Sequence, residues 1–333
     1  PIYTLFPSHD ALPIYANDYA NNWASQTIVK WMGYGVINGY GDSSFKPNAA
    51  ITRAEFAKII GSVLGLSGDG KAQFTDVKST DWFAKNVDAV AYYKYMQGAN
   101  NQFRPTDKMT REEAAVVLHR ALTMSQPQTT SLKFSDGNKV SAWAIKAVAQ
   151  MTNKGIIVGN PDNTFRAKGN ITRAEALTLI DRSCGSLVNT AKTVNGNFTG
   201  NLIVNTADVV LKNVNITGDL IIAEGVGQGD VKLDNVVVSG RMIVRGGGEN
   251  SITITNSEIS GALIVMKIDG KLRIVAAGST SIPTVQTHSG VKLQEQGLTG
   301  AGFGSVEIIV ILPGRQIVRS EEHTSELQSR HNL

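Results

Sequence analysis

The sequence predicts a chain of mixed fold class, with an all-α N-terminal region built from three repeats and a right-handed parallel β-helix or solenoid after it. Two observations support this division. A five-residue helix-start motif occurs three times at a spacing of about 60 residues. After Cys184 the chain becomes rich in Val, Ile, Thr, Asn and Gly, and short apolar runs recur about every 20 residues.

The recurring motif is a signal for the start of a helix. It reads Ile-Thr-Arg-Ala-Glu at residues 51–55 and 171–175, and Met-Thr-Arg-Glu-Glu at residues 109–113. Thr followed three residues later by Glu, just before an apolar run, is a capping box. We assign this structural role to six residues, and expect the loss of each to cost about 1 kcal/mol. They are Thr52, Glu55, Thr110, Glu113, Thr172 and Glu175.

Capping does not require the Arg that each motif also contains. Each Arg lies in the first helical turn, beside backbone N–H groups that a helix leaves unpaired and beside the positive end of its dipole. This combination suits an anion, and a planar carboxylate best. A single Arg is usually a solvated charge or part of a salt bridge, but three share one frame here. We therefore predict that an anionic ligand contacts Arg53, Arg111 and Arg173.

Each repeat is predicted to fold as a helix, a loop and a second helix. The first helices begin at a Trp and cover residues 23–32, 82–95 and 143–153. A loop of turn residues ends in a Phe, and the second helix follows the capping box. The apolar positions of the second helices share one face, and Cys184 lies among them, which predicts a buried small residue rather than a reactive thiol.

Aromatic and acidic side chains supply further candidates for ligand contact. A Trp at a helix start usually packs under the next element, so we assign three mainly to the core, with sugar contact as the alternative: Trp23, Trp82 and Trp143. The loop residues Tyr40 and Asp42 are candidates for sugar binding, with Asp162 at the equivalent position in repeat three. A loop Asp is also an ordinary turn residue.

These units resemble the S-layer homology domain, which occurs as three tandem copies on bacterial surface proteins. The resemblance covers about half of the chain and rests on the Trp-led helix, the glycine loop, the Phe and the Thr-Arg-Ala-Glu motif. It implies a compact three-pronged helical bundle that anchors an extracellular protein to the cell wall without a covalent bond. The implied partner is an anionic, pyruvylated secondary cell wall polymer linked to peptidoglycan, held in grooves between prongs with the motif Arg on its carboxylate.

The copies differ, and we expect grooves of unequal competence. The loop of repeat two is one residue shorter and lacks the Tyr and the Asp, while Glu112 adds a negative charge beside Arg111. Repeat three has Asn160 where repeat one has Tyr40. Repeat one lacks the Phe-x-Asp sequence that opens the other two repeats.

The second region predicts two interleaved series of strands. Four short runs each follow a Gly, at residues 201–204, 219–222, 241–244 and 262–265, and longer runs cover residues 209–216, 231–238 and 252–259. The longer runs contain Asn213, Asn235 and Asn256, whose spacing predicts a ladder of stacked amides. We expect about four or five coils.

The resulting boundaries place the three repeats at residues 17–66, 67–124 and 125–185, a linker at 186–193 and the solenoid at 194–318. Residues 1–16 and 319–333 match neither pattern and are predicted to be non-native, so a missing export signal carries no weight. Because the chain contains one cysteine, Cys184, it can form no intramolecular disulfide and no cysteine-based zinc site. We find no apolar stretch long enough to span a membrane.

The distribution of charged residues along the sequence limits which functions are plausible. Residues 17–185 contain 20 Lys and Arg against 14 Asp and Glu, and residues 186–318 contain 10 of each. This modest surplus contains no basic run, so we predict a polyanionic glycan rather than nucleic acid as partner. Charges in the second region are scattered without an acid–base pair, so we predict no catalytic residue, metal or cofactor.

We therefore predict a non-enzymatic wall anchor with a β-helical stalk or passenger. The alternative is a wall-attached polysaccharide lyase or hydrolase, with catalysis in the β-helix or in a missing segment. The sequence leaves the oligomeric state open.

Overall fold

The computed structural model describes residues 18–71, 74–312 and 315–321. They form two compact units, the first containing residues up to 183 except 63–65, and the second containing 63–65 and the residues from 184 onward. Of the terminal segments predicted to be non-native, residues 1–16 and 322–333 lie outside the described residues, and 319–321 end the last strand.

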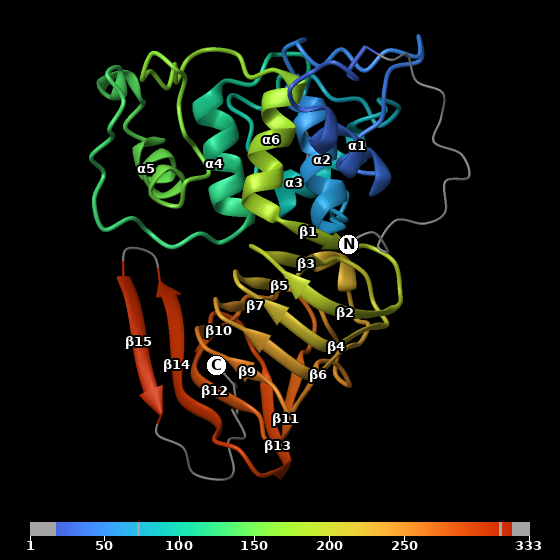
Figure 1. Ribbon diagram of the computed structural model, residues 1–333, viewed down its shortest axis with the longest axis vertical. Helices are drawn as coiled ribbons and strands as arrows, with labels where there is room; N and C mark the ends of the chain where they lie inside the picture. The colour runs from blue at the N-terminus through green and yellow to red at the C-terminus, as the bar shows by residue number, and fades with distance from the viewer. Residues whose placement is uncertain (1–17, 72–73, 313–314, 322–333) are drawn as a thin grey trace. The chain divides into compact units, whose positions relative to one another are not determined.

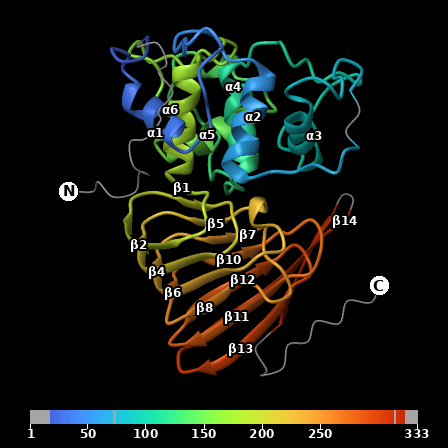
Figure 2. The ribbon, with the colours of Figure 1, turned by 90° about the vertical axis from the view of Figure 1, so that its right-hand side faces the viewer.

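The first unit contains a pair of α-helices in each repeat. These are α1 (Ser25–Gly33) and α2 (Arg53–Leu64), α3 (Ala84–Tyr92) and α4 (Arg111–Ala121), and α5 (Ile145–Asn153) and α6 (Arg173–Cys184). The second helices α2, α4 and α6 stand together, and α1, α3 and α5 lie around them (Figures 1 and 2). Each first helix begins two residues after its Trp rather than at it. Long irregular loops, a 3-10 turn at Gly137–Lys139 and isolated β-bridges join the helices, so an all-α bundle is not confirmed.

A ring of backbone hydrogen bonds closes the three repeats on one another. The amide of Ile51 donates to the carbonyl of Ile171 at 3.0 Å, Ile171 donates to Met109 at 2.9 Å, and Met109 donates to Ile51 at 3.0 Å. All three side chains are buried. Since each of these residues immediately precedes a capping Thr, the ring holds the three helix-start motifs in one frame around a shared centre.

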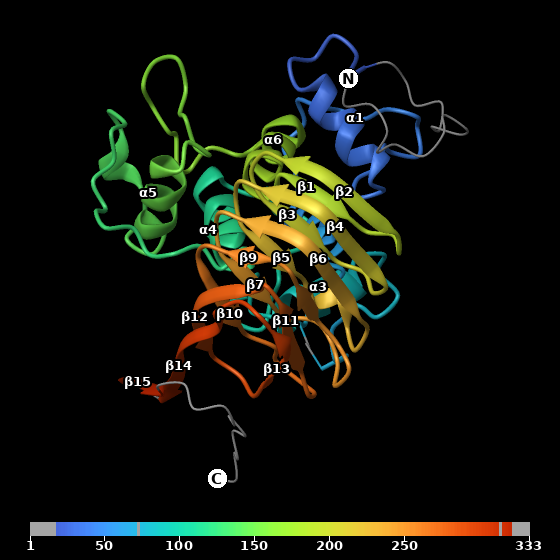
Figure 3. The same ribbon diagram turned by 60° about the horizontal axis from the view of Figure 1, so that its bottom comes forward.

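The second unit is a β-solenoid of about six turns, more than the four or five expected. One row of parallel strands runs in the order β1 (Ser186–Val188), β3 (Leu202–Val204), β5 (Leu220–Ile222), β7 (Met242–Val244), β10 (Ala262–Val265), β12 (Ser281–Thr287) and β14 (Gly302–Leu312). The other contains β2 (Thr193–Phe198), β4 (Val209–Ile216), β6 (Val231–Val238), β8 (Thr253–Thr255) with β9 (Glu258–Ile259), β11 (Arg273–Gly278) and β13 (Lys292–Leu298) (Figure 3). A 3-10 turn covers Glu224–Val226, and β15 (Arg315–Glu321) pairs antiparallel with β14.

Columns of similar residues explain the solenoid repeat. Leu202, Leu220 and Met242 are fully buried one above another in the core. The glycines before β5, β7 and β10 have no room for a side chain, because an added Cβ would lie 2.5 Å from the backbone of the preceding coil, as on Gly240 next to the carbonyl oxygen of Gly218. The backbone of successive coils is therefore in direct contact at this column.

The predicted asparagine ladder is present for one pair. Asn213, Asn235 and Asn256 all adopt positive φ, at 53°, 56° and 49°, where Asn is favoured among the residues with a side chain. The Asn235 amide nitrogen donates to the side-chain oxygen of Asn213 at 2.7 Å. The side-chain oxygen of Asn256 instead accepts the amide of Ser279 at 3.1 Å, so the ladder does not continue through all three.

Candidate functional site

Capping interactions fix the first turn of α2, α4 and α6. The amide of Glu113 donates to the Thr110 hydroxyl at 3.3 Å, and the Thr110 amide donates to Glu113 Oε2 at 2.9 Å. The same two hydrogen bonds join Thr52 with Glu55, and Thr172 with Glu175. Each second helix therefore starts at its motif Arg, with a fixed backbone direction.

The remaining backbone donors of these helix starts are already occupied, contrary to the expectation that they are unpaired. In α2, the amides of Arg53 and Ala54 donate to the carbonyls of Asp107 and Pro105 at 2.9 and 3.0 Å. The equivalent amides of α4 and α6 donate in the same way to carbonyls of residues 167–169 and 47–49. The chain of the next repeat in the ring crosses each helix end, so an anion cannot be bound there by free N–H groups.

The three motif Arg residues form a second ring, in which each guanidinium reaches the motif Glu of another repeat. The Nη1-to-Oε1 distances are 3.6 Å for Arg53 and Glu113, 2.8 Å for Arg111 and Glu175, and 3.1 Å for Arg173 and Glu55. Each Nε also donates to the carbonyl of a loop Phe at 2.9 Å, in the order Phe103, Phe165 and Phe45. The guanidinium groups are therefore partly neutralised by intramolecular partners.

The three guanidinium groups differ in how many of their N–H donors are hydrogen-bonded and in how exposed their side chains are. In Arg53 and Arg173 the Nη2 group donates to the carbonyls of Gln97 and Asn38 at 2.9 and 3.0 Å, and their side chains are 6% and 4% exposed. The Arg111 side chain is 17% exposed. Its Nη2 group has no hydrogen bond within the described part of the chain. Among the described residues, Nη2 of Arg111 and Nη1 of Arg53, which lies 3.6 Å from Glu113, are therefore the motif guanidinium groups without a hydrogen bond.

The aromatic ring of Tyr40 packs against the guanidinium of Arg173. The Arg173 guanidinium lies 4.6 Å from the centre of the Tyr40 ring, and the Tyr40 hydroxyl donates to Glu55 Oε1 at 2.6 Å. Burial and this hydrogen bond raise the pKa of Tyr40 to about 12. At the equivalent place beside Arg111, the shorter Asn160 turns back and donates to the carbonyl of Thr164 at 2.9 Å.

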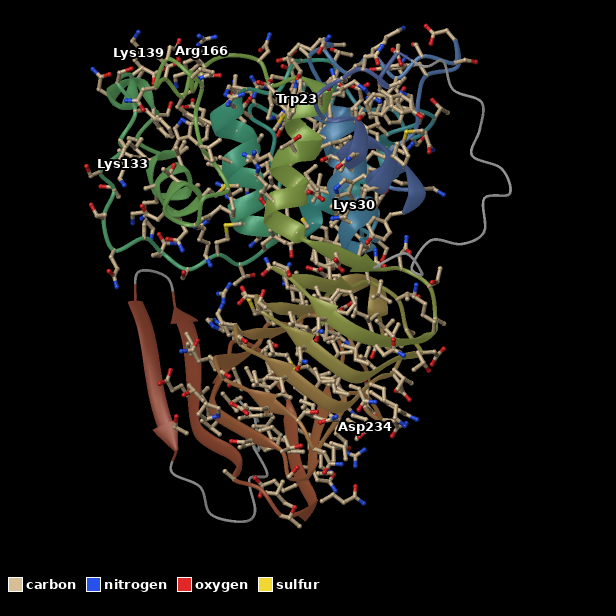
Figure 4. The ribbon with its side chains drawn as sticks, viewed as in Figure 1. Trp23, Lys30, Lys133, Lys139, Arg166 and Asp234 are labelled. Carbon is tan, nitrogen blue, oxygen red and sulfur yellow. The ribbon has the colours of Figure 1, made fainter. Side chains whose placement is uncertain are left out.

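A cavity of about 220 Å³ opens beside Arg111 and lies between repeats. Repeat one contributes Trp23, repeat two contributes Arg111, and repeat three contributes the rest of the wall, including Val158, Asn160, Glu175, Thr178 and Arg182. Figure 4 shows Trp23 beside α6, where its indole forms one wall of the cavity. The site combines two guanidinium groups, one carboxylate and an aromatic surface.

The three Trp residues at the helix starts are not core residues. Trp23, Trp82 and Trp143 are 67%, 61% and 58% exposed. They lie in the turn before each first helix, and the next residue in the chain points inward instead, as the buried Ala24 and Ala144 show. The assignment of these Trp residues mainly to the core was wrong, and their indole faces are available for contact.

The two loop carboxylates have local partners. Asp42 accepts the amide of Ser44 at 3.1 Å and lies 2.7 Å from Lys46 Nζ. Asp162 makes the same contacts with Thr164 and Arg166. Hydrogen bonds from the Thr164 and Arg166 side chains lower the pKa of Asp162 to about 2. Both residues therefore act as turn residues, and a sugar contact by either stays a prediction.

An Asp that begins each repeat was recognised in only two of the three. The carboxylate of Asp76 accepts the amides of Phe103 and Arg104, and Asp136 accepts those of Phe165 and Arg166. Asp18 makes the same pair of bonds to repeat one, at 3.0 and 2.8 Å. Repeat one thus retains the Asp of the Phe-x-Asp sequence, and the spacing of 58 residues between Asp18 and Asp76 is the sequence signal for it.

Glu112 does not place its charge against Arg111 as expected. Its side chain is buried and accepts the amide and hydroxyl of Ser141, at 2.9 and 3.0 Å, and the Lys168 ammonium at 2.5 Å. Because successive helix residues point about 100° apart, Glu112 faces away from the cavity. It links repeat two to repeat three.

Carboxylates of the solenoid contact basic residues on neighbouring coils. Asp219 lies 2.5 Å from Arg241, Glu224 lies 3.1 Å from Arg245, and the last pair is buried. Within the described ranges, no three His, Cys, Asp or Glu side chains are grouped to hold a metal ion. No helix among the same residues is both long and apolar enough to cross a membrane.

Comparison with known proteins identifies the repeats. The family model of the S-layer homology domain matches residues 17–57, 73–115 and 133–177. Over 169 residues, the chain is 36% identical to an amylopullulanase of Thermoanaerobacterium thermosulfurigenes, covering 49% of this chain and 9% of the relative. It is 34% identical over 155 residues to a cellulosome-anchoring protein of Acetivibrio thermocellus, covering 44% and 35%.

A third relative is a surface-layer 125 kDa protein of Lysinibacillus sphaericus, which is 28% identical over 182 residues, or 53% of this chain and 15% of the relative. The chain therefore spans a small part of the length of these curated relatives. The shared part has a size that fits the three repeats rather than the whole of any relative.

Proposed function

We propose that this chain, whose three repeats are S-layer homology domains, holds a bacterial surface protein on the cell wall without a covalent bond. Two relatives are named as a surface-layer protein and a cellulosome-anchoring protein. The observation that carries the proposal is the closed ring of three repeats, in which the guanidinium of Arg111 lines the cavity between neighbouring repeats. The corresponding location is extracellular, at the wall.

The ligand we propose is an anionic secondary cell wall polymer with pyruvate ketals. A planar carboxylate matches the fork of a guanidinium, and a pyruvate ketal carries one carboxylate on a sugar ring. The Nη2 group of Arg111 supplies donors for a carboxylate oxygen, and exposed Trp23 supplies an aromatic face of the kind that packs against apolar faces of sugars. A polyanion also suits the basic surplus of residues 17–185.

The three repeats act as one three-pronged helical module in this proposal. Helix ends, capping Glu residues and motif Arg residues of each repeat are completed by another repeat. A single repeat cut out of the chain would expose these buried polar groups without partners, which costs about 1–3 kcal/mol for each group. Binding therefore requires all three repeats together.

The solenoid is proposed to be a stalk or passenger. An alternative, a wall-attached lyase or hydrolase, is favoured by relatives named as an amylopullulanase and an exoglucanase. The ion pairs of the solenoid carboxylates give no support to acid–base chemistry there. Incubating the full chain with acidic polysaccharides and measuring reducing ends separates these functions, because the anchor releases none.

Co-sedimentation tests the anchoring function directly. The full chain is mixed with purified walls of Lysinibacillus sphaericus, before and after hydrofluoric acid removes the phosphodiester-linked polymer. We expect the chain to pellet with untreated walls, to stay in the supernatant with extracted walls, and to be displaced by soluble wall polymer but not by an equal charge of DNA. Equal binding to both wall preparations would refute the proposed ligand.

A further inference from the structure

We propose that Asn38 is a site of spontaneous deamidation, in which the Arg173 guanidinium promotes attack of the Gly39 backbone nitrogen on the Asn38 side chain. The product is an isoaspartate whose new carboxylate lies against that guanidinium. The modification requires no enzyme, and it does not depend on which ligand the repeats bind. Three observations carry it: the residue that follows Asn38, the state of the Gly39 amide and the position of Arg173.

The first observation is the Asn-Gly pair itself, which lies in an irregular loop. Residues 38 and 39 are between α1 and α2, and Asn38 is exposed to solvent. An asparagine cyclises when the backbone nitrogen of the next residue attacks its side-chain carbonyl carbon. Glycine favours this step, because it has no side chain in the way and its backbone turns easily. The sequence contains one other such pair, Asn195 and Gly196, but that pair belongs to β2, which is paired with β4.

The second observation is that neither reacting group has a partner to give up. Among the residues that the structure describes, the Gly39 amide donates no hydrogen bond, and the Asn38 side chain makes none. The next amide, that of Tyr40, donates to the carbonyl of Ser44 at 2.7 Å, so the loop is held just beyond the pair. Cyclisation of Asn38 therefore breaks no existing contact of the attacking nitrogen or of the attacked side chain.

The third observation is a cation on the carbonyl that shares a peptide group with the attacking nitrogen. Nη2 of Arg173 donates to the Asn38 backbone oxygen at 3.0 Å, and the Arg173 side chain is 4% exposed. When the Gly39 nitrogen loses its proton, the negative charge is shared with this oxygen, because the peptide group is conjugated. A hydrogen bond from a guanidinium strengthens as its acceptor becomes charged. Arg173 therefore stabilises the nucleophilic form of the Gly39 amide.

The reaction balances without a cofactor or an oxidant. The Gly39 amide proton passes to water, and the nitrogen forms a bond with Asn38 Cγ. The bond between Cγ and Nδ2 breaks, and Nδ2 leaves as ammonia after taking up a proton. Water then adds to the former backbone carbonyl carbon of Asn38, which Arg173 polarises, and ring opening leaves that carbon as a carboxylate. One water enters and one ammonia leaves, so no group is oxidised or reduced.

Repeat two supplies a natural comparison with the same hydrogen bond. Nη2 of Arg53 donates to the carbonyl of Gln97 at 2.9 Å, and Gly98 follows Gln97 in the chain. A Gln side chain is one methylene longer than Asn, so it must close a six-membered ring, which forms much more slowly than the five-membered ring of Asn. Gln97 is therefore expected to stay intact where Asn38 reacts, and Gln97→Asn is expected to create a second site.

The product changes the charge around Arg173. Isoaspartate has a carboxylate where Asn38 had a neutral carbonyl, and the same guanidinium already has Nη1 3.1 Å from Glu55. Two carboxylates then face one cation, so an anionic wall polymer is repelled more strongly from this part of repeat one. This consequence, unlike the modification itself, rests on the proposed function. Deamidation at Asn38 thus acts as a slow chemical clock that weakens anchoring as the protein ages.

Peptide mapping by mass spectrometry of the full chain tests the modification. The chain is incubated in neutral buffer made with heavy-oxygen water, either folded or unfolded in urea, and digested with trypsin, which releases residues 31–53 as one peptide. We expect Asn38 to deamidate faster in the folded chain than in urea, because only folding brings Arg173 to its carbonyl. Asn195 should show the opposite order, since β2 holds its backbone in a strand. Isoaspartyl methyltransferase should label the modified Asn38 peptide.

Variants test the part that the guanidinium plays. Arg173→Lys keeps the charge but not the fork, and should slow deamidation of Asn38 about tenfold, which corresponds to one charge-assisted hydrogen bond. Arg111→Lys is the matched control, since it changes the same motif position beside another loop and should leave the rate unchanged. Gln97→Asn should deamidate in the folded chain, and adding Arg53→Lys should slow this new site. Tryptophan fluorescence confirms that each variant is folded.

The outcomes separate the modification from its effect on anchoring. A rate at Asn38 that is no higher in the folded chain than in urea overturns the promotion by Arg173, and so does an unchanged rate in Arg173→Lys. If Arg173→Lys does not fold, Gln97→Asn with and without Arg53→Lys decides, and an intact Asn in that variant overturns the proposal.

Co-sedimentation with walls compares fresh and aged chains. We expect the aged wild type to bind less, and aged Asn38→Ser, which cannot deamidate, to bind like the fresh chain. Equal binding by fresh and deamidated wild type overturns the effect on anchoring. A fresh chain that does not bind walls contradicts the proposed function, whereas the mass spectra then still decide the modification.

Discussion

Glu55 and Arg173 lie 118 residues apart in the chain, yet Oε1 of the first is 3.1 Å from Nη1 of the second. The other carboxylate oxygen of Glu55 caps its own helix by accepting the amide of Thr52 at 2.7 Å. One side chain therefore starts a helix and joins repeat one to repeat three. The motif Thr-x-x-Glu with Arg between them encodes both the helix start and the assembly of the ring.

Breaking this ring is expected to destabilise the first unit. In Glu55→Gln the buried Arg173 guanidinium loses its counter-charge, which we expect to cost about 2–4 kcal/mol of unfolding free energy, near the values for a broken buried pair. Urea unfolding followed by tryptophan fluorescence measures it, because all four Trp residues belong to the first unit. Asp162→Asn is the control, since its exposed partnership with Arg166 should contribute less than about 1 kcal/mol.

The Asp that opens each repeat should matter equally in all three. Asp18→Ala removes the acceptor of two backbone amides, those of Phe45 and Lys46, and should cost about 1–3 kcal/mol. Asp76→Ala and Asp136→Ala should cost the same within about 1 kcal/mol. A small effect for Asp18→Ala beside large effects for the other two would show that repeat one is built differently.

Local pattern predicted most of the fold. The strands β4 and β6 have the bounds expected from their apolar runs, and α2, α4 and α6 begin within their predicted motifs. Such features depend on residues close in sequence, such as a capping Thr and its Glu. The number of coils was underestimated because the last coils, with β11 to β14, do not repeat the Gly and Asn spacing of the earlier ones.

The candidate site could be predicted only in part, because it depends on contacts between repeats. The frame of the three Arg residues was visible, but the carbonyls of Gln97 and Asn38 that occupy two of them come from other repeats. The inward turn of Glu112 and the outward turn of the Trp residues likewise follow from packing. The difference between Tyr40 and Asn160 is visible in the sequence, but only the structure shows that Tyr40 donates to Glu55 whereas Asn160 donates to Thr164.

Stability of the first unit should fall in acid. Burial alone raises the pKa of Glu55, but hydrogen bonds from Tyr40 and Thr52 and the charge of Arg173 together lower it below the usual 4.5. For Asp136, burial likewise raises the pKa, and the amides of Phe165 and Arg166 lower it below 3.8. Because the folded pKa values are depressed, these groups stabilise fully above the unfolded values and progressively less as pH falls through the folded ones.

Urea midpoints read by tryptophan fluorescence between pH 7 and pH 2.5 measure this effect, and we expect the decline to begin near pH 4.5. Glu55→Gln should be less stable at pH 7 and should decline less steeply, since one of the titrating groups is gone. A wild-type midpoint that stays constant down to pH 3 would contradict the assigned ionic contacts.

The solenoid should not tolerate a side chain in its glycine column. In Gly240→Ala the new Cβ would lie 2.5 Å from the carbonyl oxygen of Gly218 and 2.6 Å from the Asp219 carboxylate. Two coils must separate to admit it, so we expect faster hydrogen exchange in peptides that span β6 and β7. Gly290→Ala is the matched control, because nothing lies within 4 Å of its added Cβ, and equal exchange in both variants would contradict close backbone stacking there.

The asparagine pair should contribute through both conformation and hydrogen bonding. Asn235→Gly keeps the positive φ of 56° accessible and removes the 2.7 Å bond to Asn213, so we expect the opening free energy of β4 and β6 to fall by about 0.5–1.5 kcal/mol. Asn235→Ala keeps a Cβ in the left-handed region without the polar side chain that favours Asn there, so it should cost about 1–2 kcal/mol more than Asn235→Gly. Native-state hydrogen exchange measures both. Asn213→Ala combined with Asn235→Gly should cost less than the two single changes added together, because both remove the same bond, and full additivity would show that the amides do not interact.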